Sequence, residues 1–369
     1  MHKKYLKYSF ILFLSIMSII ASINFVVDPG EIYLKKIIAD KKSSEFTDKL
    51  FESKYGIIQT GWNERLIKTT LARQAPKFEC VIIGSSHIMS ISSIKNTGNI
   101  TSQCKNLLNL GVSGGGIEDI AIFTNIILKN IELPKIVFIG IAPWTLKFNM
   151  DSRYGAYKNQ YIQINQLLQF SNKDSSNAYE TKYIKNLFNF EYLTYSLTEL
   201  FENKKITKKE SLFDKKILYP KNSFPLYSGY DEAVTLQDGS HVYAKKWIAQ
   251  QKNENQSMPF GGGDYKLSEV IYDKNTIGYL QKLVDLYKYN DIKIKFILTP
   301  YHPNVFKKGD TKAVQSFKVI EEITRRFAQI NNIQVYGSYF PRKLGCKESE
   351  YYDFMHPNEK CLNRIDFSK

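Results

Sequence analysis

Two short stretches, far apart in the chain, carry side chains that together could activate a hydroxyl group. Gly84-Ser85-Ser86-His87 follows an apolar run, and Asp353 precedes His356 by three residues near the C-terminus. A serine hydroxyl is a weak nucleophile at neutral pH unless a neighbouring base accepts its proton. An imidazole can do so when a carboxylate holds its other ring nitrogen. We therefore expect Ser86 to act as nucleophile, His356 as general base and Asp353 as the acid that orients it.

Both stretches also have simpler interpretations. Residues three apart on a helical turn lie on one side, so Asp353 can reach His356. The same pair is compatible with a surface loop and a cap that do no chemistry. A shift of one residue in the register of the first stretch would make Ser85 the nucleophile. His87 fits core packing as well as substrate contact.

A glycine-rich segment lies between these stretches in the chain. Asn109 ends a second apolar run, and residues 113–116, which include Gly114, lead into a helix-like stretch. Backbone N–H groups in such a turn, close to a helix N-terminus, can stabilise an oxyanion. Phosphate binding is the rival use, but the segment matches neither the P-loop nor the dinucleotide-binding fingerprint.

Short apolar runs alternate along the chain with stretches of helical periodicity. This alternation predicts an α/β fold with a parallel sheet of about five strands and helices on both faces. Ligands bind such a sheet beyond the carboxyl ends of its strands, which is where residues 84–87 lie. The expected strands are 80–83, 105–110, 135–141, 293–298 and 333–336, and the expected helices are 117–129, 276–289 and 313–330.

The N-terminus has the pattern of a membrane anchor. Three lysines precede Ser9–Val27, a segment of 19 residues without a charge. This is about the length that a helix needs to cross a bilayer. Lysines on its N-terminal side predict that this end stays in the cytoplasm and that the bulk of the chain is extracytoplasmic, in a periplasm or at the cell surface. A cleavable signal peptide is the alternative, although the Ala-x-Ala pattern is absent.

Composition narrows the class of partner. The 369 residues carry a formal net charge of +15, which suits nucleic acid, an acidic glycan or a lipid headgroup surface. Export of the chain would exclude nucleic acid as a partner. The hydrophobic share of 43% is ordinary for a folded protein.

The cysteines and histidines give no sign of a metal site. There is no Cys-x-x-Cys pair, and no two of the five histidines stand at ligand spacing, so we expect neither metal nor cofactor. In an oxidising compartment the four cysteines can pair. A disulfide between Cys346 and Cys361, which closes a short loop, is preferred over the other pairings, and free buried thiols are the alternative.

The interval 151–272 breaks the alternation of strands and helices and is rich in Tyr, Asn and Lys. It is interpreted as an insertion over the loop edge of the sheet. Its seven lysines between Lys204 and Lys221 form either a solvated face or a cationic surface for glycan or membrane. The expected organisation is a cytoplasmic stub and anchor (1–30), a connector (31–75), a hydrolase-like domain (76–150 and 273–369) and the insertion (151–272).

Taken together, these pieces resemble a known family. A strand ending Gly-x-Ser, a strand ending Asn-x-x-x-Ser-Gly and a C-terminal Asp-x-x-His resemble the SGNH/GDSL hydrolase superfamily. They look most like its membrane-anchored members near polysaccharide loci, the alginate acetylation and DltD-like proteins. The resemblance covers 79–145 and 293–360 and implies a flavodoxin-like three-layer α/β/α sandwich. Asn63, Arg65, Lys68 and the stretch Leu298–Pro303 also resemble those anchored proteins.

The resemblance implies roles for single residues. It assigns Ser86, His356 and Asp353 to the triad, and the backbone N–H groups of Ser86 and Gly114 to the oxyanion hole. Two positions depart from the family. Ser85 replaces an aspartate, and Ala142 stands where an asparagine that donates to the oxyanion is expected. Loss of one such donor typically costs about a hundredfold to a thousandfold in rate.

The expected function is that of a membrane-anchored extracytoplasmic serine esterase or O-acyltransferase, for example an O-acetyltransferase, acting on an anionic or acylated cell-surface polysaccharide. The alternative is a catalytically weak glycan-binding or assembly protein that partners an integral-membrane acyltransferase. Candidates for substrate contact are Ser85, His87, Asn109, Trp144 and His302.

Overall fold

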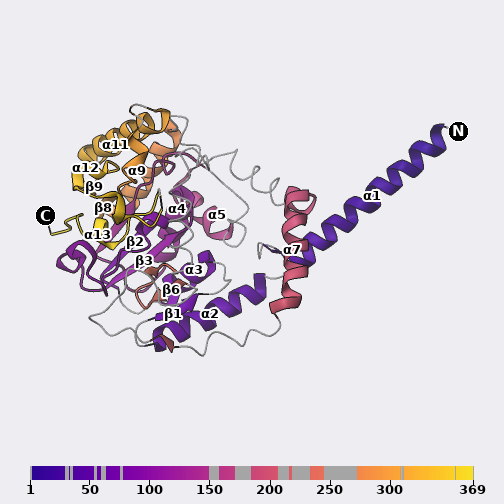
Figure 1. The fold of residues 1–369 in the computed structure, drawn as a ribbon, viewed down its shortest axis with the longest axis horizontal. Helices are drawn as coiled ribbons and strands as arrows, with labels where there is room; N and C mark the ends of the chain where they lie inside the picture. The colour runs from indigo at the N-terminus through magenta and orange to yellow at the C-terminus, as the bar shows by residue number, and fades with distance from the viewer. Residues whose placement is uncertain are drawn as a thin grey trace.

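The computed structural model describes most of the chain, drawn in Figure 1. Every structural statement below refers to the residues that it describes. These are 2–29, 33, 36–53, 56–59, 64–74, 78–148, 158–170, 184–206, 216–217, 233–244, 272–307, 309, 311–353 and 355–368.

A parallel five-stranded sheet forms the centre of the fold, with the strand order β3-β2-β4-β8-β9. All five strands coincide with apolar runs that the sequence predicts, with differences at their ends. The strands β2 and β3 are buried along their whole length, which explains why their sequences are nearly continuous in apolar residues. The bounds are β2 Cys80–Ser85, β3 Leu107–Val112, β4 Ile136–Gly140, β8 Lys293–Leu298 and β9 Gln334–Gly337.

The two faces of this sheet are covered differently. Alternate residues such as Val81 and Ile83 share a core with long helices, whereas Cys80 and Ile82 share one with short segments and the C-terminal stretch. The connections from β3 to β4, from β4 to β8 and from β8 to β9 all move the same way across the sheet, so right-handed crossovers put their helices on one face. The connection from β2 to β3 moves in the opposite direction and therefore lies on the other face. Helices on both faces were expected, but the long ones gather on one. They are α3 Glu64–Gln74, α4 Ile117–Ile127, α9 Lys274–Tyr289 and α11 Lys312–Asn331.

Shorter elements cover the second face and the loop edge of the sheet. The 3₁₀ helix at residues 97–102 and the C-terminal helix α13 place Ile100 and Leu362 against this face. The bounds of the other short elements are η1 Ser86–Ile88, α10 Asn304–Lys307, α12 Pro341–Leu344, η5 Glu348–Glu350 and α13 Glu359–Leu362.

Residues 31–75, expected to be a polar connector, belong largely to the folded body. They form α2 Lys36–Glu52, β1 Gly56–Gln59 and α3, and they bury Phe46, Leu50 and Leu71 completely. Strand β1 joins a second, antiparallel sheet with the order β5-β1-β6-β7. Its other strands are β5 Lys216–Ile217, β6 Ala233–Leu236 and β7 His241–Val242.

The described parts of the interval 151–272 lie in three different places. Helix α5 (Lys158–Leu167) packs beside α4, where Asn125 donates to the carbonyl oxygen of Gln160 at 3.2 Å. Helix α7 (Phe190–Ile206) lies against α1, and the β6–β7 hairpin belongs to the second sheet. The side chains of the seven lysines between 204 and 221 lie outside the described residues.

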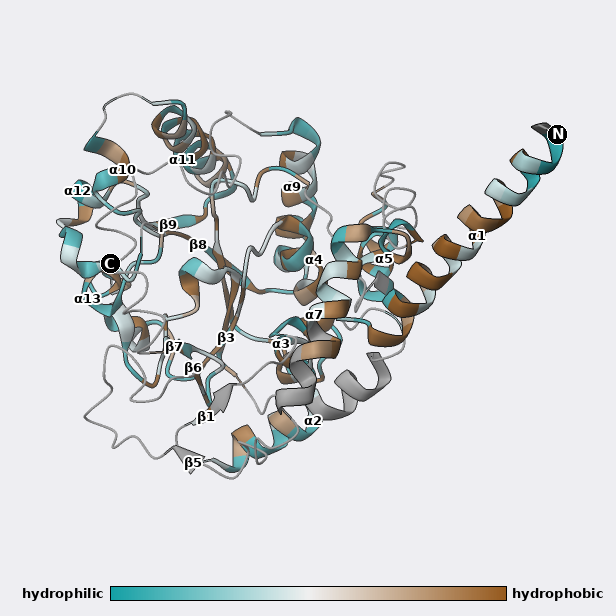
Figure 2. Cartoon of the chain, turned by 45° about the vertical axis from the view of Figure 1, so that its right-hand side comes forward, coloured by the Kyte–Doolittle hydropathy of each residue, from teal (hydrophilic) through white to brown (hydrophobic). Residues whose placement is uncertain are grey.

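Helix α1 (His2–Val27) extends away from the rest of the chain, with α7 across its C-terminal end (Figure 1). Figure 2 shows it as hydrophobic over most of its length. It is long and apolar enough to span a membrane or to act as a signal sequence.

The four cysteines form two disulfides, and no cysteine is free. The predicted bridge between Cys346 and Cys361 is confirmed. The second bridge joins Cys80, at the start of β2, to Cys104 in the segment before β3. Two bridges are typical of chains that fold in an oxidising compartment.

Candidate active site

The two stretches that the sequence singled out, residues 84–87 and 353–356, meet at the carboxyl edge of the parallel sheet. Ser86 follows β2 directly, and its Oγ lies 2.8 Å from Nε2 of His356, which is 270 positions further along the chain. The other ring nitrogen of His356, Nδ1, lies 2.7 Å from Oδ2 of Asp353. This is the order of hydrogen bonds in a serine triad. Ser86, and not Ser85, makes the bond to the imidazole.

The Asp353 carboxylate is held by backbone as well as by the imidazole. Its Oδ1 accepts hydrogen bonds from the N–H groups of Met355 at 2.7 Å and His356 at 2.6 Å. Burial alone would raise the pKa of this carboxyl, but the His356 ring and the two N–H groups outweigh burial, so its pKa is lowered. Asp353 is therefore ionised and accepts a hydrogen bond from the Nδ1–H group of His356. The other ring nitrogen, Nε2, then faces Ser86 as the acceptor.

The loop that carries Asp353 and His356 is closed on itself. Tyr352 donates its N–H to the His356 carbonyl oxygen at 2.9 Å, and Tyr351 and Pro357 form an isolated bridge. The Cys346–Cys361 disulfide joins the two ends of this loop. A second cross-link is the ion pair between Glu350 and Arg364 at 2.8 Å. These constraints fix the imidazole relative to the serine.

Close packing at three strand ends fixes the turn that carries Ser86. A Cβ on Gly140 would lie 2.6 Å from Ile88, and a Cβ on Gly111 would lie equally close to the same side chain. A Cβ on Gly84 would meet the Gly140 carbonyl oxygen at 2.9 Å. Ile88 thus packs across glycines at the ends of β2, β3 and β4, and no larger residue fits there.

Asn109, a candidate for substrate contact, is used inside the protein. Its side chain is fully buried and donates to the carbonyl oxygens of Ile88 and Ile91, each at 2.8 Å, while its own oxygen accepts the Gly111 N–H at 2.8 Å. The amide therefore holds the chain that follows Ser86. It positions the turn rather than reaching a substrate.

Two buried cations hold the glycine-rich turn and the strand that precedes it, β3. Arg65 pairs with Asp119 through two hydrogen bonds of 2.9 and 3.1 Å, and it donates to the Ser113 carbonyl oxygen at 2.9 Å. Lys68 donates to the carbonyl oxygens of Asn109, at 2.9 Å, and Gly239. Burial lowers the pKa of Lys68 to about 8. Asn63, the third residue of that group, lies outside the described residues.

The glycine-rich turn lies beside the end of β2. A Cβ on Gly115 would come within 2.5 Å of the Gly84 carbonyl oxygen, so only glycine fits there. Gly114 is exposed and has a φ of +60°, in the left-handed region that favours glycine. Within the described part of the chain, neither its N–H nor that of Ser86 donates a backbone hydrogen bond. The close approach of Gly115 to Gly84 thus places this turn beside the backbone that leads to Ser86.

Ala142 stands where the resemblance to SGNH hydrolases predicts an asparagine, and it offers no side-chain amide. The Ala142 N–H donates to Thr145 Oγ1 at 2.9 Å, which closes a tight turn after β4. Trp144 projects from this turn, and its indole N–H donates to the Gly115 carbonyl oxygen at 2.9 Å. The indole therefore ties the end of β4 to the glycine-rich turn, and its N–H is occupied.

Aromatic rings surround the imidazole of His356. The His87 ring lies 5.0 Å from the His356 ring and 4.7 Å from Tyr301, centroid to centroid, with Trp144 at 5.6 Å. Burial and, second, the nearby His356 lower the pKa of His87 well below its usual value. Among the described residues, neither ring nitrogen of His87 has a hydrogen-bond partner. His87 is thus a neutral, buried imidazole beside the triad.

Two other candidates from the sequence have structural roles. Ser85 is buried, and its Oγ accepts the His87 N–H at 3.5 Å. His302 is buried too, with Nδ1 accepting the Asn304 N–H at 3.1 Å and Nε2 lying 3.2 Å from the Glu348 carbonyl oxygen. This is the arrangement of a residue that stabilises a turn.

Two aromatic residues next to the site were not among the candidates named from the sequence. Tyr301 follows β8, and Tyr243 comes from the hairpin in the interval 151–272, with its ring 6.0 Å from that of His356. The Tyr243 ring also lies 4.6 Å from that of Tyr352, on the loop of the triad. Tyr301 belongs to the Leu298–Pro303 stretch, which the sequence had singled out. Tyr243 stands in an interval with many tyrosines and no periodic pattern, so nothing marked it.

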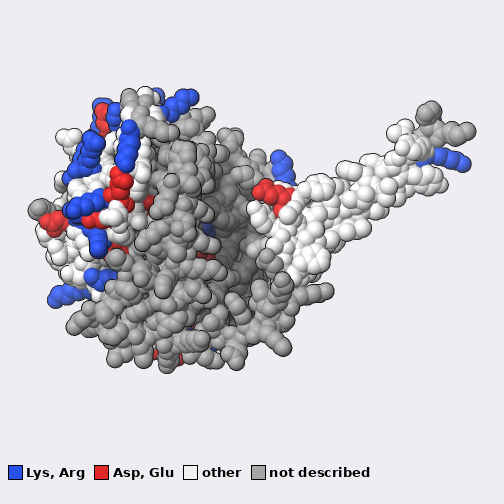
Figure 3. Space-filling view, in the orientation of Figure 1, with Lys and Arg blue, Asp and Glu red and all other residues white. Residues whose placement is uncertain are grey.

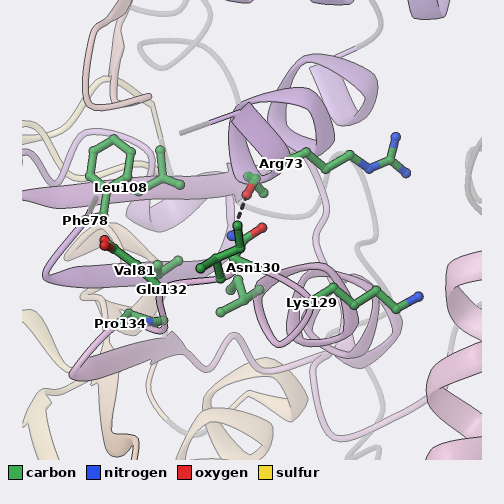
Figure 4. A pocket seen from close by; sticks show the side chains of 11 residues that line it. Arg73, Phe78, Val81, Leu108, Lys129, Asn130, Glu132 and Pro134 are labelled. Atoms are coloured by element: carbon green, nitrogen blue, oxygen red, sulfur yellow. Dashed lines mark hydrogen bonds between the residues drawn. The ribbon is translucent and has the colours of Figure 1, made fainter. Parts of the chain in front are cut away.

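Two hollows lie away from the triad. One, of about 390 Å³, opens between α3, α4 and the amino ends of the strands, and Asn130 donates there to the Ala72 carbonyl oxygen at 2.9 Å (Figure 4). The other, of about 720 Å³, is a shallow groove along α11 and α12. Figure 3 shows Lys and Arg gathered over these helices, interleaved with acidic residues.

No protein-family model matches the chain, and no curated protein is significantly similar to it. The chemical interpretation of the site therefore depends on its geometry.

Proposed function

We propose that this protein is a serine esterase or O-acyltransferase. The observation that carries the proposal is the hydrogen-bonded chain from Ser86 through His356 to Asp353, with distances of 2.8 and 2.7 Å. A hydroxyl, an imidazole and a carboxylate in this order have a chemical use in acyl transfer. A protein that only binds has no need for all three at these distances.

In this mechanism the Ser86 oxygen attacks the carbonyl carbon of an ester, and its proton moves to Nε2 of His356. Asp353 stabilises the imidazolium that forms. The N–H groups of Ser86 and Gly114 face the developing oxyanion. His356 returns the proton to the leaving alkoxide, which leaves an acyl group on Ser86. Water or a sugar hydroxyl then attacks this acyl-enzyme, with His356 as base again.

The finer fold assignment is part of the proposal. Counting β2 as the first strand, the order of the parallel sheet is 2-1-3-4-5, which is the flavodoxin-like order. In this order the chain reverses direction beside the first strand, and ligands bind at that point. Ser86 stands there. We assign the chain to the SGNH-type three-layer sandwich, with the short segments of the second face as the third layer and residues 151–272 as the insertion.

The proposed substrate is an acylated or anionic polysaccharide at the cell surface. Three features support this class: the apolar N-terminal helix, the two disulfides and the net charge of +15. The first two fit an anchored, extracytoplasmic domain, and the third fits an anionic polymer. The transferred group is proposed to be acetyl, and no cofactor takes part in this mechanism.

A second candidate function has one observation in its favour. Ala142 offers no side-chain donor to the oxyanion, and the nearby indole N–H of Trp144 is bound to Gly115. A chain that has lost a donor could serve as a weakly active glycan-binding partner of an integral-membrane acyltransferase. The intact triad geometry favours the enzyme over this alternative.

Labelling with a fluorophosphonate probe distinguishes the two. The full chain in detergent is the right material, because α1 packs against α7 and removal of the anchor would uncover that contact. We expect one adduct, on Ser86, located by mass spectrometry of the digest. His356→Ala is the matched control, since it removes the base and leaves the serine in place.

Each outcome assigns the function. An adduct on Ser86 that is lost in His356→Ala supports the enzyme. No adduct with the probe, together with no hydrolysis of a small acetyl ester, rejects the enzyme in favour of the binding partner. If the enzyme is supported, a sugar hydroxyl acceptor added with the ester separates a transferase, which forms the acylated sugar, from a hydrolase, which releases acetate only.

A further inference from the structure

The C-terminal end of α1 is bound to the protein by a buried polar side chain. Asn24 stands in the apolar helix and is fully buried. Its amide donates to the carbonyl oxygens of Asn186, Leu187 and Asn189 at 3.2, 2.9 and 3.2 Å. Its side-chain oxygen accepts the hydroxyl of Ser196 on α7 at 2.9 Å. A fully satisfied buried amide of this kind specifies one docking position.

A second buried group completes the junction. Asp28, directly after α1, accepts the Tyr33 N–H at 2.7 Å and the hydroxyl of Tyr192 at 3.2 Å. Tyr192 and Ser196 stand four residues apart, on one side of α7. This side of α7 therefore faces α1, and the last turns of α1 form part of the folded structure.

A different side of α7 is apolar and uncovered. Phe190, Leu200 and Phe201 are 64%, 46% and 70% exposed. Leu193 and Leu197, half-buried, continue the same stripe at helical spacing. The stripe is defined as Phe190, Leu193, Leu197, Leu200 and Phe201. Glu191 and Thr198, which are exposed, lie on another side of the helix.

The docking point fixes the depth of this stripe relative to a bilayer. The uncharged part of α1, Ser9–Val27, is about 28 Å long at 1.5 Å per residue. It needs nearly all of this length to cross a hydrocarbon core of about 30 Å. Asn24 stands three residues before Val27, or about 5 Å inside the outer end of the span. A helix docked there lies at the boundary between hydrocarbon and headgroups.

We infer that α7 is an interfacial membrane helix whose apolar stripe lies in the outer boundary of the same bilayer that α1 crosses. Helices with an apolar side and a polar side bind this boundary in its plane. The stripe is continuous with an apolar span, and Lys204 and Lys205 begin the lysine-rich segment that follows it. Such lysines are attracted to anionic lipid headgroups. The inference rests on the proposed anchoring of α1 and is independent of the proposed chemistry.

Nitroxide labels on the full chain in liposomes test the inference. The liposomes contain phosphatidylcholine and phosphatidylglycerol. All four native cysteines are in disulfides, so a single introduced cysteine is the only reactive thiol. Phe190→Cys and Phe201→Cys place labels on the stripe, and Glu191→Cys and Thr198→Cys are matched controls on the same helix. Ile16→Cys, 47% exposed on α1, reports insertion of the anchor. The measurement is collision with oxygen, which concentrates in lipid, against a water-soluble nickel chelate.

We expect the stripe labels to collide several-fold more with oxygen than with the chelate, and the two control labels to show the reverse. Equal exposure of all four α7 labels to the chelate would overturn the inference. Stripe labels shielded from both reagents would also overturn it, because a protein surface would then cover the stripe. A label at residue 16 that is open to the chelate would instead show that α1 does not insert, which refutes the anchoring.

Discussion

The two edges of the parallel sheet differ in what they offer a ligand. The carboxyl edge carries Ser86, His356 and Asp353 in a hydrogen-bonded chain, enclosed by aromatic rings. The amino edge has a hollow of about 390 Å³, lined by apolar side chains and by Arg73, Lys129, Asn130 and Glu132 (Figure 4). Reactive groups thus converge at the carboxyl edge, whereas the described residues that line the hollow at the amino edge form no such group.

This difference shows that space alone does not mark a site. At the amino edge, the hydrogen bond from Asn130 to the Ala72 carbonyl oxygen joins a side chain to the backbone and closes the local structure. At the carboxyl edge, the bonds of Asn109 and Asp353 also stabilise the fold, but they hold a serine and an imidazole in contact. Orientation of reactive groups by surrounding bonds is what catalysis requires. Substitutions at the two edges should therefore differ by orders of magnitude in their effect on activity.

The largest effect is expected from Ser86→Ala. Without the nucleophile, turnover of a small acetyl ester should fall on the order of 10⁶-fold, as in other serine triads. Ser85→Ala is the matched control, because Ser85 is buried and makes one long bond of 3.5 Å to the His87 N–H. Steady-state kinetics of both variants check the difference. Equal losses in the two variants would contradict the assignment of Ser86 and make the adjacent serines equivalent.

Asp353→Asn should cost about 10⁴-fold in kcat. The amide would still occupy the carboxylate position, but it cannot stabilise an imidazolium and favours the wrong tautomer of His356. The folded structure should persist, since the neighbouring Cys346–Cys361 disulfide closes the loop independently. The check combines kcat with a thermal unfolding midpoint. A loss below about tenfold in kcat would mean that the carboxylate only caps its loop.

Removing the Cys346–Cys361 bridge should lower both stability and activity. A closed loop of 15 residues is worth about 3 kcal/mol of unfolding free energy in the chain-entropy account. The loop also holds Asp353 and His356, so kcat of the Cys346→Ala/Cys361→Ala variant should fall even where the protein is fully folded.

The other bridge supplies the comparison for this experiment. Cys80→Ala/Cys104→Ala removes a bridge that closes a longer loop and lies at the start of β2, away from Ser86. It should lower the free energy of unfolding by a similar amount, with kcat nearly unchanged. The measurements are the free energy of unfolding in urea and kcat, compared between the two double variants. If kcat falls equally in the two, the first bridge has no special role in the site.

The buried imidazole of His87 should make the protein less stable in acid. Its pKa is lowered well below the usual value in the folded state and is about 6.5 in the unfolded state. The unfolded state therefore binds the additional proton first as pH falls. Stability is retained above pH 6.5 and is lost below it, by up to about 1.4 kcal/mol per pH unit.

His87→Phe removes this titration while keeping a ring among Tyr301 and Trp144. The loss of unfolding free energy between pH 7 and pH 5, measured with urea, should be smaller in the variant than in the parent. Protonation of Asp353 does not interfere, because its pKa is lowered and lies below this window. Identical pH dependence in both proteins would show that His87 is solvated.

Much of the fold was predictable because buried strands and half-buried helices each have a characteristic spacing of apolar residues. The strands β2, β3 and β4 are buried and show nearly continuous apolar sequences, β8 is buried over its last three residues, and α9 and α11 show one apolar side each. Residues 36–74 were not predictable in the same way. Their buried residues, such as Phe46 and Leu50, stand among lysines and acids and show no clear period.

The site was predictable as far as side-chain chemistry identifies it. Ser86, His356 and Asp353 could be named because a nucleophile, a base and an acid are rare in this order. The roles of Asn109 and His302 were not, because both depend on carbonyl groups whose positions only the folded backbone defines. Tyr243 reaches the imidazole by the pairing of β6 with β1, which no local pattern indicates.

The smallest effect is expected at the amino edge. Arg73→Ala/Lys129→Ala removes the two cationic side chains that line its hollow, while the Asn130 bond to Ala72 remains. These groups stand at the opposite end of the strands from Ser86, and surface charges at that distance are largely screened at physiological salt. Turnover of the acetyl ester should therefore change less than twofold, which the assay used for Ser86→Ala can resolve. If activity fell tenfold or more, the amino edge would be coupled to the triad through the strands, and the contrast between an empty hollow and a working site would not hold for this protein.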